Sequence, residues 1–249
     1  MDDPRRRISE LTRIIKKELA DSLIALYLYG SVPVGGFVER KSDIDLLAVT
    51  ATDITEAQLP SLAKFHGAFV EAHPEWDNRI EVGYVSQAVL QTLSDEPSGS
   101  FAVVSPGEPV HIRSPDASWV LNWHSVTTTG ETLFGPSPLE IGSPISPEVF
   151  RRVLRGQLAY WGDEVRSRWI GHSRAYQGYI VLTVCRALYG LETGRATTKE
   201  RAGEWAADRF PEWADFMQDA VRWHRADLSE PHSTTIKFVD FATHFANLS

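Results

Sequence analysis

Patterns typical of β-strands are confined to the first third of this 249-residue chain. Three apolar runs have the length and the bordering Gly, Ser and Asp residues of strands. Helical spacing of apolar residues precedes the first run and separates the second from the third. The strand runs cover residues 22–30, 42–50 and 79–86, and the helical patterns cover residues 5–20 and 54–73, the latter with Pro60 as an interruption. This order of elements favours a small α/β domain.

The second half of the chain has almost no strand-like pattern. Residues 97–116 are irregular, with scattered Pro and Gly, and an apolar segment follows at 118–136. The Pro-rich stretch "GPSPLEIGSPISPE", residues 135–148, is the clearest linker. Helical patterns then lie near residues 147–170, 174–191, 197–209, 211–227 and 233–247. The sequence therefore predicts an α+β protein with an α/β domain over residues 1–146 and an α-helical bundle domain over residues 147–249.

Charge and composition argue against several kinds of partner. The net charge is −8, and the acidic excess lies in residues 1–146, which hold 20 Asp and Glu against 11 Lys and Arg. Such a chain lacks the cationic surface that neutralises phosphates, so we expect no nucleic-acid partner. No apolar run reaches the about 18 residues of a membrane-spanning helix, so we expect no membrane partner. A single cysteine, Cys185, allows no intrachain disulfide; we expect a cytoplasmic protein and a monomer.

Three acidic residues at the predicted strands point to a metal site. Asp43 and Asp45 are one residue apart at the start of the second strand, so both side chains lie on one face while Ile44 turns into the core. At about 4 Å such carboxylates repel by about 4 kcal/mol for an effective dielectric constant of about 20. A shared proton or a divalent cation such as Mg²⁺ offsets that repulsion. If the third strand lies beside the second, Glu81 completes a cluster of three carboxylates.

Gly30 and Ser31, at the end of the first strand, add a phosphate-binding element. A glycine there permits close approach of the backbone, and the following N–H groups together with the serine hydroxyl can hold a phosphate. Metal ions clamped by carboxylates opposite such a cradle form the apparatus of nucleotidyl transfer, in which one ion activates the attacking oxygen and the other steadies the leaving pyrophosphate. The residues therefore favour a nucleotidyltransferase that uses Mg²⁺, with two ions expected.

The same residues carry a resemblance to a known family. The stretch "YGSVPVGGFVERKSDIDLLAV" resembles the G-S…D-x-D signature of the polymerase-β-like nucleotidyltransferase superfamily, and more narrowly the aminoglycoside adenylyltransferases of the streptomycin/spectinomycin type. In the second half, "YIVLTVCRALYGLETGRATTKERAGEWAADRFPEW" resembles the helical C-terminal domain of that family. The resemblance covers nearly the whole chain and implies a mixed sheet in the first domain.

The resemblance implies Mg²⁺-dependent transfer of AMP from ATP to a hydroxyl of an aminoglycoside or aminocyclitol antibiotic, and hence resistance. Asp43 and Asp45 would hold Mg²⁺, and Glu81 would be the base that deprotonates the drug hydroxyl. The residues that would contact the triphosphate are Gly30, Ser31 and Ser42 in the first domain, and Arg186 and Lys199 in the helical domain.

The acceptor-binding part of the family pattern is changed. The family places an acid just before the "VLT" helix. Here that stretch reads "HSRAYQGYIVLT", which has no acid but contains Tyr176. Trp161 in "QLAYWGDE" matches the tryptophan of streptomycin users, whereas the tryptophan expected some way after the base is missing from "FAVVSPGEPVHIRSP". Asp163 and Glu164 are the nearest acids that could substitute. We therefore expect Trp161 and Tyr176 to contact the acceptor.

Two other functions remain open from the sequence. The same chemistry could act on another small molecule or on a protein. The chain could also be a non-catalytic nucleotide-binding or antitoxin-like module that keeps the fold, although all three carboxylates expected of an active enzyme are present.

Overall fold

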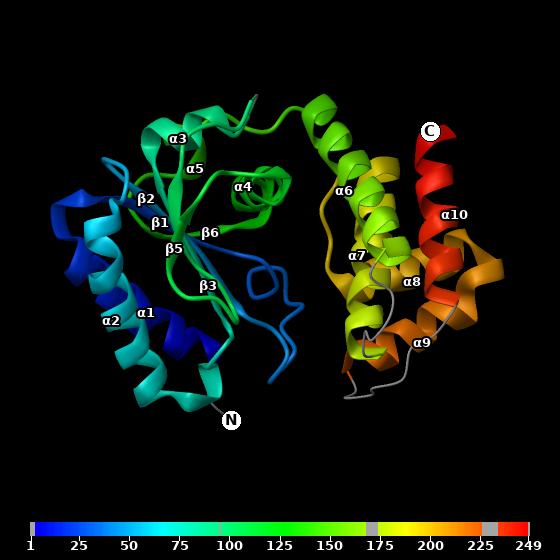
Figure 1. Ribbon diagram of the computed structural model, residues 1–249, viewed down its shortest axis with the longest axis horizontal. Helices are drawn as coiled ribbons and strands as arrows, with labels where there is room; N and C mark the ends of the chain where they lie inside the picture. Colours follow the sequence, from blue (N-terminus) through cyan, green and yellow to red (C-terminus); the bar gives the residue numbers. More distant parts are fainter. Residues whose placement is uncertain (1–2, 95, 168–173, 226–233, 249) are drawn as a thin grey trace. The chain divides into compact units, whose positions relative to one another are not determined.

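The chain forms two compact units, Met1–Ser146 and Pro147–Ser249. The computed structural model describes residues 3–94, 96–167, 174–225 and 234–248 (Figure 1). Within these ranges no helix is both long and apolar enough to cross a membrane. Because all strands of the described residues lie in the first unit and the described part of the second is helical, the predicted α+β class is confirmed.

The first unit is built on one six-stranded sheet in the order β5-β4-β3-β2-β1-β6. Strands β2 and β3 are parallel and every other neighbouring pair is antiparallel, so the sheet is mixed, as the resemblance implies. The strands are β1 (Leu23–Tyr29), β2 (Ile44–Thr50), β3 (Ile80–Ser86), β4 (Phe101–Val104), β5 (His111–Arg113) and β6 (Glu131–Phe134). The first three match the predicted runs; the last three, of three or four residues each, were not predicted.

Five helices accompany this sheet: α1 (Pro4–Leu19), α2 (Leu59–Ala72), α3 (Gln87–Thr92), α4 (Ala117–Thr129) and α5 (Pro138–Ile141). Pro60 does not interrupt the second predicted helix but lies in the first turn of α2, where the missing N–H of proline leaves no bond unmade. The apolar segment 118–136 contains α4 followed by β6, and the predicted linker contains the single turn of α5.

The two faces of the sheet have different roles, because alternate residues of a strand point to opposite sides. One face packs on α1 and α2, and Leu26, Leu46 and Val82 are buried there together with Leu11 and Phe69. The other face lies against α4, on the opposite side of the sheet in Figure 1. Both faces bury apolar residues, and the second face also carries the polar Tyr29, Asp45 and Glu81.

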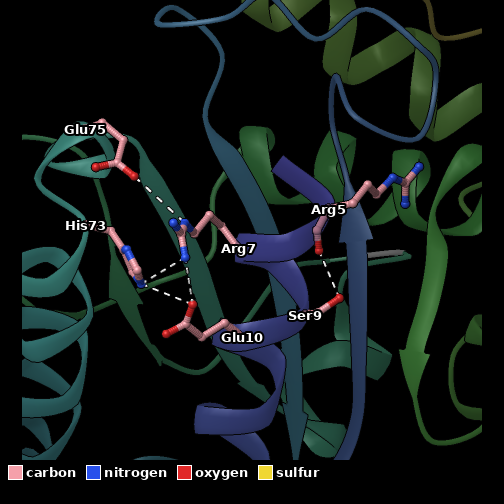
Figure 2. Close-up of polar contacts among 6 residues, drawn as sticks. All are labelled: Arg5, Arg7, Ser9, Glu10, His73 and Glu75. Carbon is pink, nitrogen blue, oxygen red and sulfur yellow. Dashed lines mark hydrogen bonds and ion pairs between the residues drawn. The ribbon is translucent and has the colours of Figure 1, made fainter. Parts of the chain in front are cut away.

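Polar contacts fasten α1 to its surroundings on both sides. Arg5 forms an ion pair with Glu131 of β6. On the other side, Glu10 Oε2 lies 3.0 Å from Arg7 Nη1 and 3.1 Å from His73 Nε2, just beyond the end of α2. Figure 2 shows the Arg7, Glu10 and His73 side chains pointing toward one another, with Glu75 at the edge of this group. This cluster joins α1 to the end of α2 and contains none of the predicted site residues.

The second unit is a bundle around a buried central helix. Its helices are α6 (Pro147–Ser167), α7 (Arg174–Thr193), α8 (Lys199–Arg209), α9 (Ala214–Arg225) and α10 (Thr234–Leu248). Helix α7 contacts the other four, and its residues Ile180 to Cys185 are all buried, including the polar Thr183. Gly194, with φ +70°, ends α7, and the Thr198 side chain caps α8 by accepting the Arg201 N–H.

All five helices predicted for this unit are present. The predicted ends at residues 168–170, 226–227 and 233 lie outside the described residues. Cys185 is buried in α7, where burial raises the pKa of its thiol.

Candidate active site

Three polar side chains form a row across the centre of the sheet. Tyr29 of β1 is paired with Asp45 of β2, and Asp45 is paired with Glu81 of β3. Residues directly opposite each other on neighbouring strands point to the same face and lie about 5 Å apart. That face is the one under α4, so the strand register brings together two of the predicted acids and a tyrosine that the sequence reading did not single out.

Gly30 lies beneath the Asp45 carboxylate. Its φ is +74°, and a Cβ added there would overlap the carboxylate oxygen Oδ2 of Asp45. Only glycine satisfies both conditions, since other residues rarely adopt a positive φ and all carry a Cβ. The close approach of backbone expected at Gly30 is therefore made to an aspartate of the row.

The hydroxyl of Ser31 is buried and has no hydrogen-bond partner within the described residues. Its carbonyl accepts the N–H of Gly36, at 2.9 Å, so the turn that follows β1 folds back on Ser31. Buried polar atoms normally find a partner, and an orphan in a turn beside two acids marks a place where a ligand supplies one. This observation suits the phosphate cradle predicted for Gly30 and Ser31.

Ser42 closes the turn that leads into β2. Its Oγ accepts the Val38 N–H at 2.9 Å, and its carbonyl accepts two donors of the Arg79 guanidinium. A contact between Ser42 and a triphosphate stays a prediction, because in this structure the Ser42 hydroxyl accepts a hydrogen bond within the turn.

Arg79 holds the segment that carries Asp43. Besides the bonds to Ser42, its carbonyl accepts the Ile44 N–H at 2.9 Å, and its guanidinium lies 4.6 Å from the ring centroid of Trp76. Burial lowers the pKa of Arg79, and the neighbouring Asp43 carboxylate opposes that shift. Asp43 therefore lies in the field of a cation supplied by the residue just before β3.

Glu81 is held by two donors through one oxygen. The Tyr29 hydroxyl donates to Oε1 at 2.8 Å, and Asn122 Nδ2, from α4, lies 3.4 Å from Oε1 and 3.1 Å from the Tyr29 hydroxyl. Burial raises the pKa of Glu81, and the bonds from Tyr29 and Asn122 and the charge of Arg113 partly offset that rise. A carboxylate with a raised pKa is a better proton acceptor at neutral pH, as a general base requires.

A metal site formed by Asp43, Asp45 and Glu81 stays a prediction. Among the described residues, no group of three or more His, Cys, Asp and Glu side chains is arranged to hold a metal ion. In this arrangement Glu81 accepts hydrogen bonds from Tyr29 and Asn122, and Asp43 lies in the field of Arg79. Asp43 and Asp45 still provide the hard oxygen donors that Mg²⁺ prefers, beside the orphaned Ser31 hydroxyl.

In the helical unit, the two predicted phosphate ligands are on neighbouring elements. Arg186 is the one exposed residue in the buried stretch Ile180–Leu188 of α7. Lys199 is the first residue of α8, and its Nζ lies 4.3 Å from the ring centroid of Tyr179. A cation at a helix N-terminus opposes the helix dipole, and a nearby anion would relieve that conflict.

An aromatic cluster formed by Tyr160, Trp161, Tyr176 and Tyr179 contains the two residues predicted to contact the acceptor. Trp161 is 9% exposed, and its indole N–H is buried without a hydrogen-bond partner in the described ranges. Tyr176 is 36% exposed and stacks on Tyr179, with centroids 5.9 Å apart and planes 12° from parallel. Tyr176 is therefore the more accessible of the two rings, and Trp161 supports the cluster from within.

The two nearby acids differ in their partners. Asp163 forms an ion pair with Arg166 at 2.9 Å, and Arg166 also pairs with Asp240. Glu164 instead contributes its charge to raising the pKa of Tyr176, after the larger effect of burial. Of the two candidates for the missing family acid, Glu164 is the one near the aromatic cluster.

Comparison with known proteins shows a similarity to aminoglycoside adenylyltransferases. Residues 140–247 match the family model described as "Aminoglycoside adenylyltransferase, C-terminal domain". An aminoglycoside (3'') (9) adenylyltransferase of Klebsiella pneumoniae is 25% identical over 218 residues, which are 82% of this chain and 79% of the relative. The spectinomycin 9-adenylyltransferase of Campylobacter jejuni is 23% identical over 252 residues, or 93% and 90% of the two chains. Over most of its length the chain is therefore similar to aminoglycoside adenylyltransferases, and residues 140–247 match the C-terminal domain of that family.

A solved member of this family has the same fold. The spectinomycin adenyltransferase AAD(9) from Enterococcus faecialis, crystallised with ATP and spectinomycin, superposes with a TM-score of 0.78. The match covers 98% of this chain and 99% of that one at 17% sequence identity. The resemblance stated from the G-S…D-x-D signature is thus confirmed, together with the fold of an aminoglycoside adenylyltransferase over nearly the whole chain.

Proposed function

We propose that this protein transfers AMP from ATP to a hydroxyl of a spectinomycin- or streptomycin-type antibiotic and thereby confers resistance. One observation carries the proposal: in a chain similar to the aminoglycoside adenylyltransferases, Asp45 and Glu81 are paired side by side on β2 and β3, and the Asp45 carboxylate lies directly over Gly30. The Met1–Ser146 unit is then the nucleotidyltransferase domain, and the helical unit contributes to binding of nucleotide and acceptor.

The N-terminal unit supplies the groups that act on ATP. The Ser31 hydroxyl, which has no partner in the described residues, donates to a phosphate oxygen, and Gly30 lets the backbone come close. Asp43 and Asp45 would hold Mg²⁺, which neutralises phosphate charge and favours the leaving pyrophosphate. In the helical unit, Arg186 and Lys199 are the cations that we propose as phosphate ligands.

Glu81 is the proton acceptor of the reaction. Its Oε2 takes the proton of the acceptor hydroxyl, and the oxygen attacks the α-phosphorus as the bond to the pyrophosphate oxygen breaks in line. The drug leaves as its AMP ester, pyrophosphate leaves with the electron pair of the broken bond, and Glu81 ends protonated. Burial, which raises the pKa of Glu81, favours this step.

Acceptor binding falls to the aromatic cluster and Glu164. These antibiotics carry ammonium groups, which are attracted by carboxylates and by the faces of aromatic rings. Tyr176 offers an exposed ring, and Glu164 offers a nearby carboxylate. Together they would replace the acid that the family has before the "VLT" helix and that this chain lacks. Trp161 would contribute by fixing the rings beside it. A monomer suffices for this scheme.

A pyrophosphate-release assay tests the proposal. Wild-type protein with ATP and Mg²⁺ should release pyrophosphate when spectinomycin, streptomycin or a related aminoglycoside is added, and not without a drug. Release on addition of a protein extract alone would point instead to a protein acceptor. Binding of ATP without release on any addition would favour the non-catalytic nucleotide-binding module.

A further inference from the structure

Two side chains outside the acidic signature converge on one oxygen of Glu81. The Tyr29 hydroxyl and the Asn122 amide both reach Oε1, from β1 and from α4, and Asn122 also donates to Tyr29. Within the described residues, Oε2 accepts no hydrogen bond. The two donors come from positions 52 residues before and 41 residues after Glu81, so this arrangement exists only in the folded chain.

The convergence is not a simple result of packing tyrosines under α4. Tyr27 lies two residues earlier on the same strand face and is fully buried, but its hydroxyl donates to the carbonyl of Pro136 at 2.9 Å. Asn122 lies beside the buried Trp119 and Trp123 of α4, where an amide without a partner would be unfavourable. The fold thus places an amide in an apolar helix face where, among the described residues, its side chain donates only to Tyr29 and Glu81.

We propose that Tyr29 and Asn122 are positioning residues that hold Glu81 through Oε1 and leave Oε2 to receive the proton of the acceptor. The proposal rests on the function proposed above and deepens it. Neither residue touches the reacting atoms. A carboxylate tethered at one oxygen has fewer orientations, and a base presented in one orientation gains rate through its geometry. Tyr29 immediately precedes Gly30, so the same residue that orients the base is joined to the phosphate-binding turn.

Kinetics of the Tyr29→Phe and Asn122→Ala variants test this role. Each substitution removes one donor to a charged group, and we expect kcat for AMP transfer to fall about tenfold while KM for ATP stays unchanged. Because both donors act on one oxygen, their effects on kcat should not be independent. Two independent effects would lower kcat of the double variant about hundredfold, and we expect the observed fall to be smaller than that by a factor of about three or more. Alanine favours a helix more than asparagine does, so Asn122→Ala does not weaken α4 by propensity.

Tyr27→Phe is the matched control. It removes a buried hydroxyl from the same strand face and should lower the unfolding temperature about as much as Tyr29→Phe, because each loses one hydrogen bond. Its kcat should equal that of the wild type. An equal fall of kcat in Tyr27→Phe would overturn the proposal, since packing alone would then account for the effect.

Crystal structures give a readout that is independent of turnover. In the Tyr29→Phe, Asn122→Ala double variant, the Glu81 carboxylate should rotate or adopt several orientations, whereas Tyr27→Phe should leave it in place. An unmoved Glu81 in the double variant would overturn the positioning role, whatever the kinetics. If the wild type transfers AMP to no acceptor, the proposed function fails, and the orientation of Glu81 still decides the role of these two residues.

Discussion

The row of polar residues on the sheet and the aromatic cluster of the helical unit are built in different ways. Tyr29, Asp45 and Glu81 are fixed by strand register and by hydrogen bonds, and Gly30 beneath them admits no side chain. The aromatic cluster is held by ring contacts and exposes Tyr160 by 60% and Tyr176 by 36%. A substitution in the row disturbs several partners, whereas an exposed ring can change with little effect on the fold. The difference fits a protein that keeps one reaction and can vary its acceptor.

The largest effect should come from the row itself. Glu81→Gln keeps the size of the side chain but removes the base, and we expect the rate of AMP transfer to fall by about 10³-fold. Affinity for ATP, measured by calorimetry, should change little, because Glu81 is held by Tyr29 and Asn122 rather than by the Ser31 turn. Transfer at the wild-type rate by this variant would remove Glu81 from the mechanism.

A second test, in the phosphate-binding turn, separates the effect of backbone strain from the effect of steric overlap with Asp45. Gly30→Ala and Gly35→Ala both place a side chain at a positive φ, +74° and +69°, so both carry a similar backbone strain. Only at Gly30 does the new Cβ meet the Asp45 carboxylate; at Gly35 it meets nothing within 4 Å. We expect kcat/KM for ATP to fall about 100-fold in Gly30→Ala and less than about threefold in Gly35→Ala, since a small misplacement in an active site has effects of that size. Equal losses would show that the approach to Asp45 is unimportant.

Substitutions in the aromatic cluster should change acceptor binding alone. Tyr176→Ala and Glu164→Gln each remove one attraction for an ammonium group, and we expect KM for the drug to rise about fivefold to tenfold with KM for ATP unchanged. Tyr160→Phe, which keeps an exposed ring next to the same tryptophan, is the control. If KM for ATP rose as well, the cluster would serve the nucleotide, and the contrast between the two regions would fail.

The smallest effect should come from the cluster of Arg7, Glu10 and His73, which belongs to neither region. The bonds from His73 and then Arg7 hold the pKa of Glu10 below its ordinary value of 4.5. A lowered carboxylate pKa adds stability above the unfolded value, and this stability is lost as the pH falls through the folded value. Glu10→Gln should therefore lower the free energy of unfolding by about 0.5 kcal/mol at pH 7, and the gap should close in urea titrations below pH 4. Transfer activity should not change.

Much of the fold was predictable because it depends on local patterns. The apolar runs predicted β1 to β3, and helical spacing of apolar residues predicted α1 and the five helices of the second unit. The strands β4 to β6 were missed because three or four residues among Pro and Gly carry too little periodicity to be recognised. The first turn of α2 was misread because Pro60 can begin a helix as readily as break one.

The candidate site was only partly predictable, because its contacts are distant in sequence. The spacing of Asp43 and Asp45 and the acid in the third strand suggested a shared site, and the pairing of Asp45 with Glu81 follows from the parallel register of β2 and β3. The sequence could not show that the charge of Arg79 acts on Asp43 or that Glu81 accepts a hydrogen bond from α4, and a metal site shared by the three acids stays a prediction. Tyr29 could have been found from the two-residue period of β1, which ends beside Gly30. Asn122, an amide between two tryptophans, is the other overlooked signal.

Analysis of the drug after reaction tests the central claim most directly. Spectinomycin and streptomycin would each be incubated with ATP, Mg²⁺ and either wild-type protein or the Glu81→Gln variant, and the products separated and weighed by mass spectrometry. The account predicts a drug–AMP ester with the wild type for at least one of the two antibiotics, equal in amount to the pyrophosphate released, and none with the variant over the same time. Absence of an ester with the wild type, or the same ester at the same rate with Glu81→Gln, would contradict it.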